Sequence, residues 1–275
     1  MQIRYGFDIA MNLAQPTAIL TMMDVHSDHR DGIVAETELQ LSHAAPVKRF
    51  VDGNGNVLRR LFAGAGLMSL RLEGVLESNG LEDPVEPMAD ALPVPELPSE
   101  ALPFLLPSRY CESDLLSDFA WANFGAVQGG WAKVQTICDF VHQRLAFGYA
   151  HARSTRTASE ALAEGVGVCR DFTHLAVALC RCLNIPARYC NGYLGDIGVP
   201  PDPAPMDFNA WFEAYVGGRW FTFDPRHNRP RIGRILVARG RDAADVPMIT
   251  TFGTHSLTRF VVVTDEVLEG AALAA

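Results

Sequence analysis

The chain has 275 residues, which is more than one compact domain usually needs, so we expect two domains. With 48% hydrophobic and 20% charged residues, its composition is that of a globular protein and excludes a disordered chain. A formal net charge of -9 repels polyanions, so we expect neither nucleic acid nor a membrane surface as a partner.

The first part of the chain is predicted to be a β-sandwich. Short apolar runs over residues 16–23, 32–41 and 67–75 are separated by turn signals, and part of them alternates with the period of half-buried strands. Seven prolines then fall between residues 81 and 108, which is typical of a semi-rigid connection. We therefore predict a β-rich N-terminal domain over residues 1–105, ending in this linker, and a second domain over residues 106–275.

The second half opens with helical patterns. Two are predicted, over residues 113–123 and about 134–145, and Thr157 and Glu160 have the spacing of a capping box that starts a short helix ending at Gly165. A further helix is predicted from about Cys169 to Leu183. The fold class is therefore α+β.

Cys169 is expected at the N-terminus of that helix. Free amide groups and the positive end of the helix dipole favour a thiolate there, so Cys169 is a candidate nucleophile. On position alone, a small buried residue is an equally good interpretation. The other cysteines fall inside helices or strands or form no CxxC pair, so we expect reduced, mostly buried thiols.

A hairpin is predicted over residues 208–216 and 219–224, because Gly217-Gly218 separates two aromatic, β-rich runs. If Val216 faces Arg219, then Asn209 faces Arg226 and lies diagonal to Asp224 on one face. A carboxylate on a sheet opposite a helix that begins with cysteine is the layout of a nucleophile, base and orienting group.

Several motifs in order resemble the bacterial transglutaminase-like proteins. They are Gly165-Val166-Gly167-Val168-Cys169-Arg170-Asp171-Phe172, Asn184-Ile185-Pro186-Ala187-Arg188-Tyr189, Ala210-Trp211 and Phe223-Asp224-Pro225. The resemblance covers roughly residues 130 to 230 and implies a papain-like core, with the catalytic cysteine at a helix N-terminus packed against an antiparallel sheet. It also implies acyl transfer or amide hydrolysis through a catalytic triad in which Cys169 is the nucleophile and Asp224 orients the base.

The base of the triad is where the chain departs from the family. The family histidine precedes the Ala-Trp pair, and this position holds Asn209, which cannot take a proton at neutral pH. His227, three residues after Asp224, is the preferred substitute, ahead of His255; His174 is expected to be structural.

Two hypotheses for the function follow, and a third is less favoured. The first is a cytoplasmic cysteine enzyme of the hydrolase or acyltransferase type, acting on peptide or glutamine groups of a peptide or protein substrate. The second is a catalytically impaired pseudoenzyme that binds peptides or proteins, and the third is a scaffold that acts through its β-sandwich. No cofactor or metal ion is expected, because the acidic and histidine-containing run 24–31 lacks a ligand spacing and is interpreted as a polar turn. The basic run 229–241 is interpreted as a solvated segment.

Overall fold

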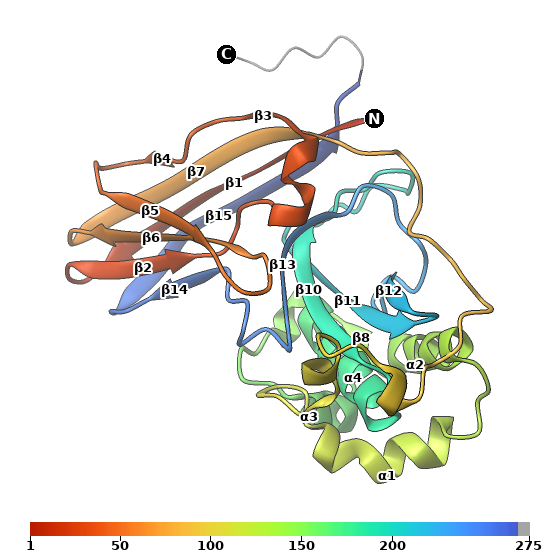
Figure 1. Cartoon of the computed structure of the whole chain (residues 1–275). Coiled ribbons are helices and arrows are strands. Elements are labelled where there is room, and N and C mark those ends of the chain that lie inside the picture. Colours follow the sequence, from red (N-terminus) through yellow and green to blue (C-terminus); the bar gives the residue numbers. More distant parts are fainter. Residues whose placement is uncertain (269–275) are drawn as a thin grey trace.

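The N-terminal strands form two antiparallel sheets packed face to face, as a computed structural model that describes residues 1–268 shows (Figure 1). The first sheet consists, in order, of β15 (His255–Glu266), β1 (Gln2–Leu13), β7 (Gly66–Glu77) and β3 (Ile33–Glu36), with β4 (Gln40–Leu41) also paired to β7. The second consists of β14 (Ile249–Thr251), β2 (Thr17–Thr21), β6 (Val57–Ala63) and β5 (Val47–Val51). The alternation of buried and exposed residues along β2, β6 and β7 is the period of two that one-sided burial requires. The predicted β-rich N-terminal region is confirmed.

The C-terminal strands belong to this sandwich. β14 pairs with β2, and β15 pairs along nearly the whole of β1. The range 106–275 expected for the second domain therefore requires a correction, because residues 249–266 complete the N-terminal sheets. The physical reason is that strand pairing is non-local: the period of an isolated strand does not reveal which sheet it joins.

The remaining residues form a helix-covered antiparallel sheet. Its strand order is β12 (Arg219–Phe223), β11 (Asn209–Val216), β10 (Ala187–Tyr193) and β13 (Ile235–Gly240). The helices are α1 (Ser113–Phe124), α2 (Gly130–Arg144), α3 (Ala158–Glu164) and α4 (Cys169–Cys182), and the short strands β8 (Ala146–Phe147) and β9 (Val166–Gly167) pair in parallel beside them. In Figure 1 these helices gather around one face and the lower end of the sheet. The predicted α+β class is confirmed.

Local sequence explains these elements well. The Thr157–Glu160 capping box is formed, and Gly165 ends α3 in the left-handed conformation. The hairpin has the expected register, with Val216 opposite Arg219, and its two glycines have the positive φ values that a tight turn requires.

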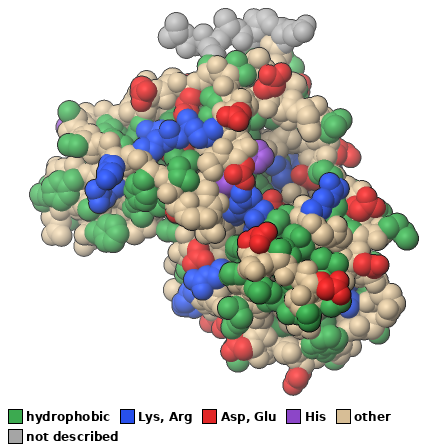
Figure 2. Space-filling view, in the orientation of Figure 1, with side chains coloured by type: hydrophobic (Ala, Val, Ile, Leu, Met, Phe, Trp, Pro, Cys, Tyr) green, Lys and Arg blue, Asp and Glu red, His purple; other side chains and the backbone are tan. Residues whose placement is uncertain are grey.

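The sandwich and the core sheet share apolar packing. One buried cluster contains Ile9 and Leu61 of the sandwich together with Tyr193 and Val237 of the core sheet. On the face shown in Figure 2, charged and histidine side chains gather where the two parts meet. The sandwich and the helix-covered sheet are therefore held together by a shared hydrophobic cluster as well as by the linker.

The proline-rich linker, residues 81–108, lies along the core. It contains two short 3₁₀ turns (Val94–Glu96 and Leu102–Leu105) and is fixed by main-chain hydrogen bonds. The Gly217 amide donates to Asp90 O at 2.7 Å and the Trp131 amide to Ala89 O at 2.8 Å. The linker thus forms part of the wall behind the hairpin.

Candidate functional site

Cys169 is the first residue of α4 and is partly exposed. The carboxylate of Asp171 accepts from the Val168 amide at 2.9 Å, which satisfies one free donor at the helix start. Behind it, Leu175 and Leu179 anchor α4 in the core. The helix therefore holds the sulfur in a fixed position at its positive end.

The surroundings of Cys169 favour the thiol at rest. Burial raises the pKa of the Cys169 thiol to about 11 and nearby Asp207 adds to the increase, while Arg226 and the Ala210 amide oppose it. This differs from the sequence expectation, in which the helix dipole lowered the pKa. Desolvation by the tertiary packing, which the position in a helix does not reveal, outweighs the favourable groups.

Asp224 is a buried and heavily bonded carboxylate just after β12. Its Oδ1 accepts from the amides of Arg226 at 3.1 Å and His227 at 3.0 Å, and its Oδ2 accepts from Arg234 Nη2 at 2.9 Å. Burial by itself would raise the pKa of Asp224, but the Arg234 charge and the hydrogen bonds of His227 outweigh it and hold this pKa below its usual range. Asp224 is thus ionised and can orient an imidazole.

His227 is the imidazole that Asp224 holds. Its Nδ1 lies 2.8 Å from Asp224 Oδ2, and its Nε2 lies 3.0 Å from Nη1 of Arg226. In the neutral ring, this geometry places the proton on Nδ1 and leaves the Nε2 lone pair facing the Arg226 guanidinium. This is the tautomer that a general base needs, although its basic atom has Arg226 as a partner.

Asn209 lies at the start of β11, and its side chain contacts Arg226 although the pairing of β11 with β12 ends at Phe212 and Phe223. Its Oδ1 accepts from Arg226 Nη1 at 3.3 Å, and its Nδ2 donates to the carbonyls of Asp207 at 3.2 Å and Leu194 at 3.4 Å. All of these contacts are hydrogen bonds of a polar positioning group. Asn209 therefore holds Arg226 and the preceding loop.

Asn209, Arg226 and His227 line a small cavity of about 50 Å³, whereas Cys169 and Asp224 do not line it. Its lining also includes Tyr149 and Asp207. Asp207 and Arg226 had not been singled out as neighbours of the thiol. Asp207 precedes Asn209 by two residues, so the alternation of a strand extended backwards is the signal that would have placed both on one side.

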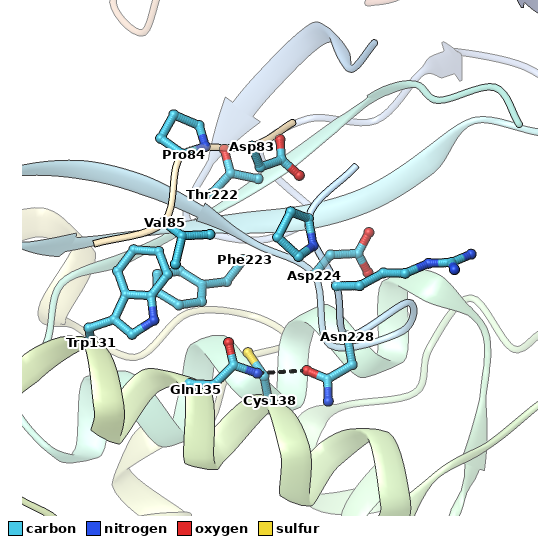
Figure 3. A pocket seen from close by; sticks show the side chains of 12 residues that line it. Asp83, Pro84, Val85, Trp131, Gln135, Cys138, Thr222, Phe223, Asp224 and Asn228 are labelled. Atoms are coloured by element: carbon cyan, nitrogen blue, oxygen red, sulfur yellow. Dashed lines mark hydrogen bonds between the residues drawn. The ribbon is translucent and has the colours of Figure 1, made fainter. Parts of the chain in front are cut away.

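Side chains of helix α2 form hydrogen bonds with the turn that carries His227. The Asn228 side chain accepts from Gln135 Nε2 at 2.9 Å and donates to Asp139 Oδ1 at 2.7 Å, and His142 Nδ1 lies 3.2 Å from Pro225 O. Figure 3 shows the Gln135–Asn228 bond at the edge of a cavity of about 420 Å³ behind Asp224. Asn228 has a φ of 51°, in the left-handed region that asparagine tolerates. The turn is therefore fixed from the helix side.

The remaining candidates have structural positions. His174 is fully buried, accepts from the Ala243 amide at 3.1 Å and stacks on Tyr110. His255 is exposed at the start of β15, 2.7 Å from Thr251 Oγ1. The remaining five cysteines are buried. Neither of these histidines takes part in the Asp224 network.

Charged side chains in two segments of the chain form ion pairs and hydrogen bonds inside the fold. In the run 24–31, Asp24 is paired with Arg59 at 2.6 Å, and His26 Nε2 lies 2.9 Å from Asn54 O. Within residues 1–268, no three histidine, cysteine or acidic side chains gather in a way that would hold a metal ion. The run 229–241 was interpreted as solvated, but it contains the core strand β13, Arg231 is buried, and the nearly buried side chain of Arg234 (7% exposed) joins Asp83 of the linker to Asp224. Because a basic run looks the same whether it faces water or a buried carboxylate, only the packing reveals this role.

Comparisons with known proteins agree with this geometry. The family model of the transglutaminase-like superfamily matches residues 120–225. A crystal structure of a protein from Cytophaga hutchinsonii, described as a "putative cysteine protease", has a TM-score of 0.84 and 30% identity, with 99% of this chain and 92% of that chain covered. The chain belongs to the transglutaminase-like superfamily. Its β-rich N-terminal region and papain-like core are thereby those of a solved relative.

Curated relatives of this transglutaminase-like protein come from mycobacteria. An uncharacterized protein of Mycobacterium leprae is 37% identical over 90 residues, and one of Mycobacterium tuberculosis strain H37Rv is 36% identical over 98 residues. Each match covers 32% of this chain, and the chain spans about a third of the length of either relative. Cys169, Asn209 and Asp224 lie within the family match and His227 lies two residues beyond it. None of the helices in residues 1–268 has the length and hydrophobicity of a membrane span.

Proposed function

We propose that the protein is a cysteine-dependent acyltransferase or amide hydrolase in which His227 takes the place of the family histidine. The observation that carries the proposal is the 2.8 Å contact between His227 Nδ1 and Asp224 Oδ2, the pairing of imidazole and carboxylate that a triad requires. Asp224 would keep the proton on Nδ1 and stabilise the imidazolium that forms when Nε2 takes a proton.

The proposed reaction begins from the thiol. A group whose pKa is about 11 is mostly protonated at neutral pH, so the attack of Cys169 on a carbonyl carbon requires a base. His227 Nε2 would accept the thiol proton as the S–C bond forms and would return it to the departing amine as the C–N bond breaks. An amine or water would then release the acyl group from sulfur. For Nε2 to act, Arg226 must move off it.

We propose a peptide or protein carbonyl as the substrate and a reducing compartment such as the cytoplasm as the location. The first follows from the acyl-transfer chemistry of the superfamily. The second follows from the need for a free thiol at Cys169, which an oxidising compartment would not preserve.

The second candidate is a pseudoenzyme that binds a peptide or protein. It is favoured by the contact of Arg226 Nη1, 3.0 Å away, with His227 Nε2, the ring nitrogen that Asp224 does not bind, and by the raised pKa of Cys169. In that case Asn209, Arg226 and His227 would only donate or accept hydrogen bonds to a bound chain.

The rate of Cys169 alkylation by iodoacetamide, measured from pH 5 to 11, separates the two candidates. The enzyme predicts a phase near neutral pH in the wild type that His227→Gln removes, leaving only the rise of the bare thiol toward pH 11. The pseudoenzyme predicts that the wild type and His227→Gln have the same profile. Cys169→Ala gives the background of the buried thiols, and His43→Gln, at an exposed histidine between β4 and β5, is the matched control for loss of an imidazole.

The variant Asn209→His tests the same proposal by restoring a histidine at the position where the family has one. If His227 already serves as the base, a second imidazole at position 209 leaves the neutral phase nearly unchanged. A large gain at neutral pH in Asn209→His alone, with no neutral phase in the wild type, would identify the natural protein as a pseudoenzyme.

A further inference from the structure

A second, larger groove lies between the sandwich and the helix-covered sheet, and Arg170, the residue after Cys169, is in its lining. Its volume is about 450 Å³, within the range of small-molecule and peptide side-chain sites. Met11 of β1 and Leu257 and Phe260 of β15 line it from the sandwich, whereas Tyr189 and Arg170 line it from the core. The groove therefore exists only because the C-terminal strands return to the N-terminal sheets.

The core wall of the groove is rigid and aromatic. Tyr110 stacks on the buried ring of His174 at 5.1 Å between ring centroids, and His174 contacts Tyr189 at 5.0 Å. The opposite wall consists of the flexible side chains Met11 and Met248 with Leu257 and Phe260. A fixed aromatic wall facing adaptable thioethers suits a large apolar group of variable shape.

The charge of the groove is positive, although the protein as a whole is acidic. Among the described residues that line it, none is acidic, and Arg170 supplies a guanidinium at its edge. Three hydrogen bonds engage Arg170, to Ser154 O, Arg153 O and Asp171 Oδ1, out of the five N–H donors of a guanidinium. Asp171 is shared with Arg156 at 2.9 Å, so it does not fully neutralise Arg170.

Two lining residues connect the groove to the nucleophile. Arg170 follows Cys169 in the chain, and Tyr189 lies near the sulfur: burial raises the pKa of Tyr189 and the charge of Cys169 adds to the increase. A chain bound covalently at Cys169 would have its neighbouring side chain within reach of the groove and its charged group within reach of Arg170.

We propose that this groove is the subsite for the acyl donor, and that it selects a peptide with a bulky apolar side chain followed by a carboxylate at Arg170. The inference rests on the proposed function, which it extends from reaction type to substrate class. It assigns to β1 and β15 a role in substrate selection.

Three alkylating probes test the groove. Iodoacetamide has no group for it, N-iodoacetyl-phenylalanine amide adds a ring, and N-iodoacetyl-phenylalanine adds the ring and a carboxylate. Each reacts in the same way: the Cys169 sulfur bonds to the methylene carbon as iodide leaves, and the thiol proton goes to solvent. At pH 9.5 some thiolate forms without a base, so the ratio of rates reports binding whether or not His227 is active.

For the wild type we expect the free acid to alkylate Cys169 about tenfold or more faster than iodoacetamide, with the amide in between, because partial burial of a phenyl ring suffices for such a factor. Leu257→Gln should remove most of the advantage of the ring. Its control is Leu115→Gln on α1, a residue of similar exposure (66% against 56%) outside the groove. Arg170→Gln should make the acid and the amide equal, whereas Arg153→Gln, which removes an exposed arginine paired with Glu160 and Glu164, should not.

Equal rates for the three probes in the wild type, or ratios that Leu257→Gln leaves unchanged, would overturn the subsite. If the ratios are as expected but no neutral phase depends on His227, the groove binds its ligand and the proposed catalysis fails. If the neutral phase depends on His227 but the three probes react at equal rates, the proposed catalysis stands and this subsite is rejected.

Discussion

His227 Nδ1 lies 2.8 Å from Asp224 Oδ2, three residues earlier in the chain. In the family pattern, the aspartate orients an imidazole from the neighbouring strand, whose position here holds Asn209. In this chain, the turn after β12 folds back so that the same carboxylate receives both the His227 amide and its ring. In the proposed triad, the acidic partner is thus retained while the source of the imidazole differs.

Replacing Asp224 with Asn should destabilise the protein and flatten its acid dependence. Arg234 is buried and would retain only Asp83, so we expect a loss of about 2–4 kcal/mol in the free energy of unfolding. The folded-state pKa of Asp224 is lowered, so its contribution is present above the unfolded pKa near 4 and is lost as pH falls below it. Urea unfolding at pH 7 and pH 3 measures this. A similar loss at pH 3 in both proteins would contradict it.

Arg226→Gln should reduce the reactivity of Cys169. Arg226 lowers the pKa of the thiol against the effects of burial and Asp207, so its removal should shift the alkylation profile to higher pH and slow the reaction at pH 9 by about threefold. The control is Arg229→Gln, which removes an exposed charge from the same turn. A rate at pH 9 that does not fall would contradict the role of Arg226 beside the thiolate, whereas a rise at neutral pH would show that Arg226 also restrains His227 Nε2.

Asn228→Gly should loosen the turn that carries His227. Glycine accepts the left-handed backbone, so the variant removes only the side-chain bonds to Gln135 and Asp139, at a cost of about 1–2 kcal/mol in unfolding free energy. The neutral phase of Cys169 alkylation should fall with it. Asn184→Gly is a matched control, since Asn184 also has a positive φ (60°) but is exposed after α4. Equal effects of the two variants would rule out a positioning role.

Alkaline pH should destabilise the protein through its buried thiols. Burial raises the pKa of Cys111 to about 12, so the stability from its neutral form is complete below the unfolded pKa near 9 and is lost as pH rises toward 12. Removing this thiol in Cys111→Ala should reduce the fall in unfolding free energy over that interval by up to about 1.4 kcal/mol per pH unit. Denaturant unfolding at pH 8, 9.5 and 10.5 provides the test, and parallel curves for the two proteins would refute it.

Much of the local structure could be predicted because it depends on neighbouring residues. The α3 capping box, the start of α4 at Cys169 and the register of the 209–223 hairpin each follow from patterns within a few turns of chain. The motifs around Cys169 and Asp224 likewise identified the superfamily. These features required no knowledge of what packs against them.

Long-range features could not be predicted in the same way. Pairing of β15 with β1 joins residues more than 240 positions apart, and the burial of Arg234 depends on a linker residue, Asp83, about 150 positions earlier. The pKa of Cys169 depends on Asp207 and Arg226, which reach it from the loop before β11 and the turn after β12. Strand period and charge pattern are compatible with many such arrangements.

The sequence by itself determined the superfamily, the helices and the hairpin of the catalytic region, and the place of a cysteine at a helix start, because these are encoded by residues close together in the chain. Only the tertiary structure decided that Asp224 holds His227, that the thiol is desolvated, and that the C-terminal strands complete the sandwich and form one wall of the groove lined by Arg170. Desolvation and hydrogen bonding act between atoms that are close in space, and the distances that set their strength are defined only when the chain has folded.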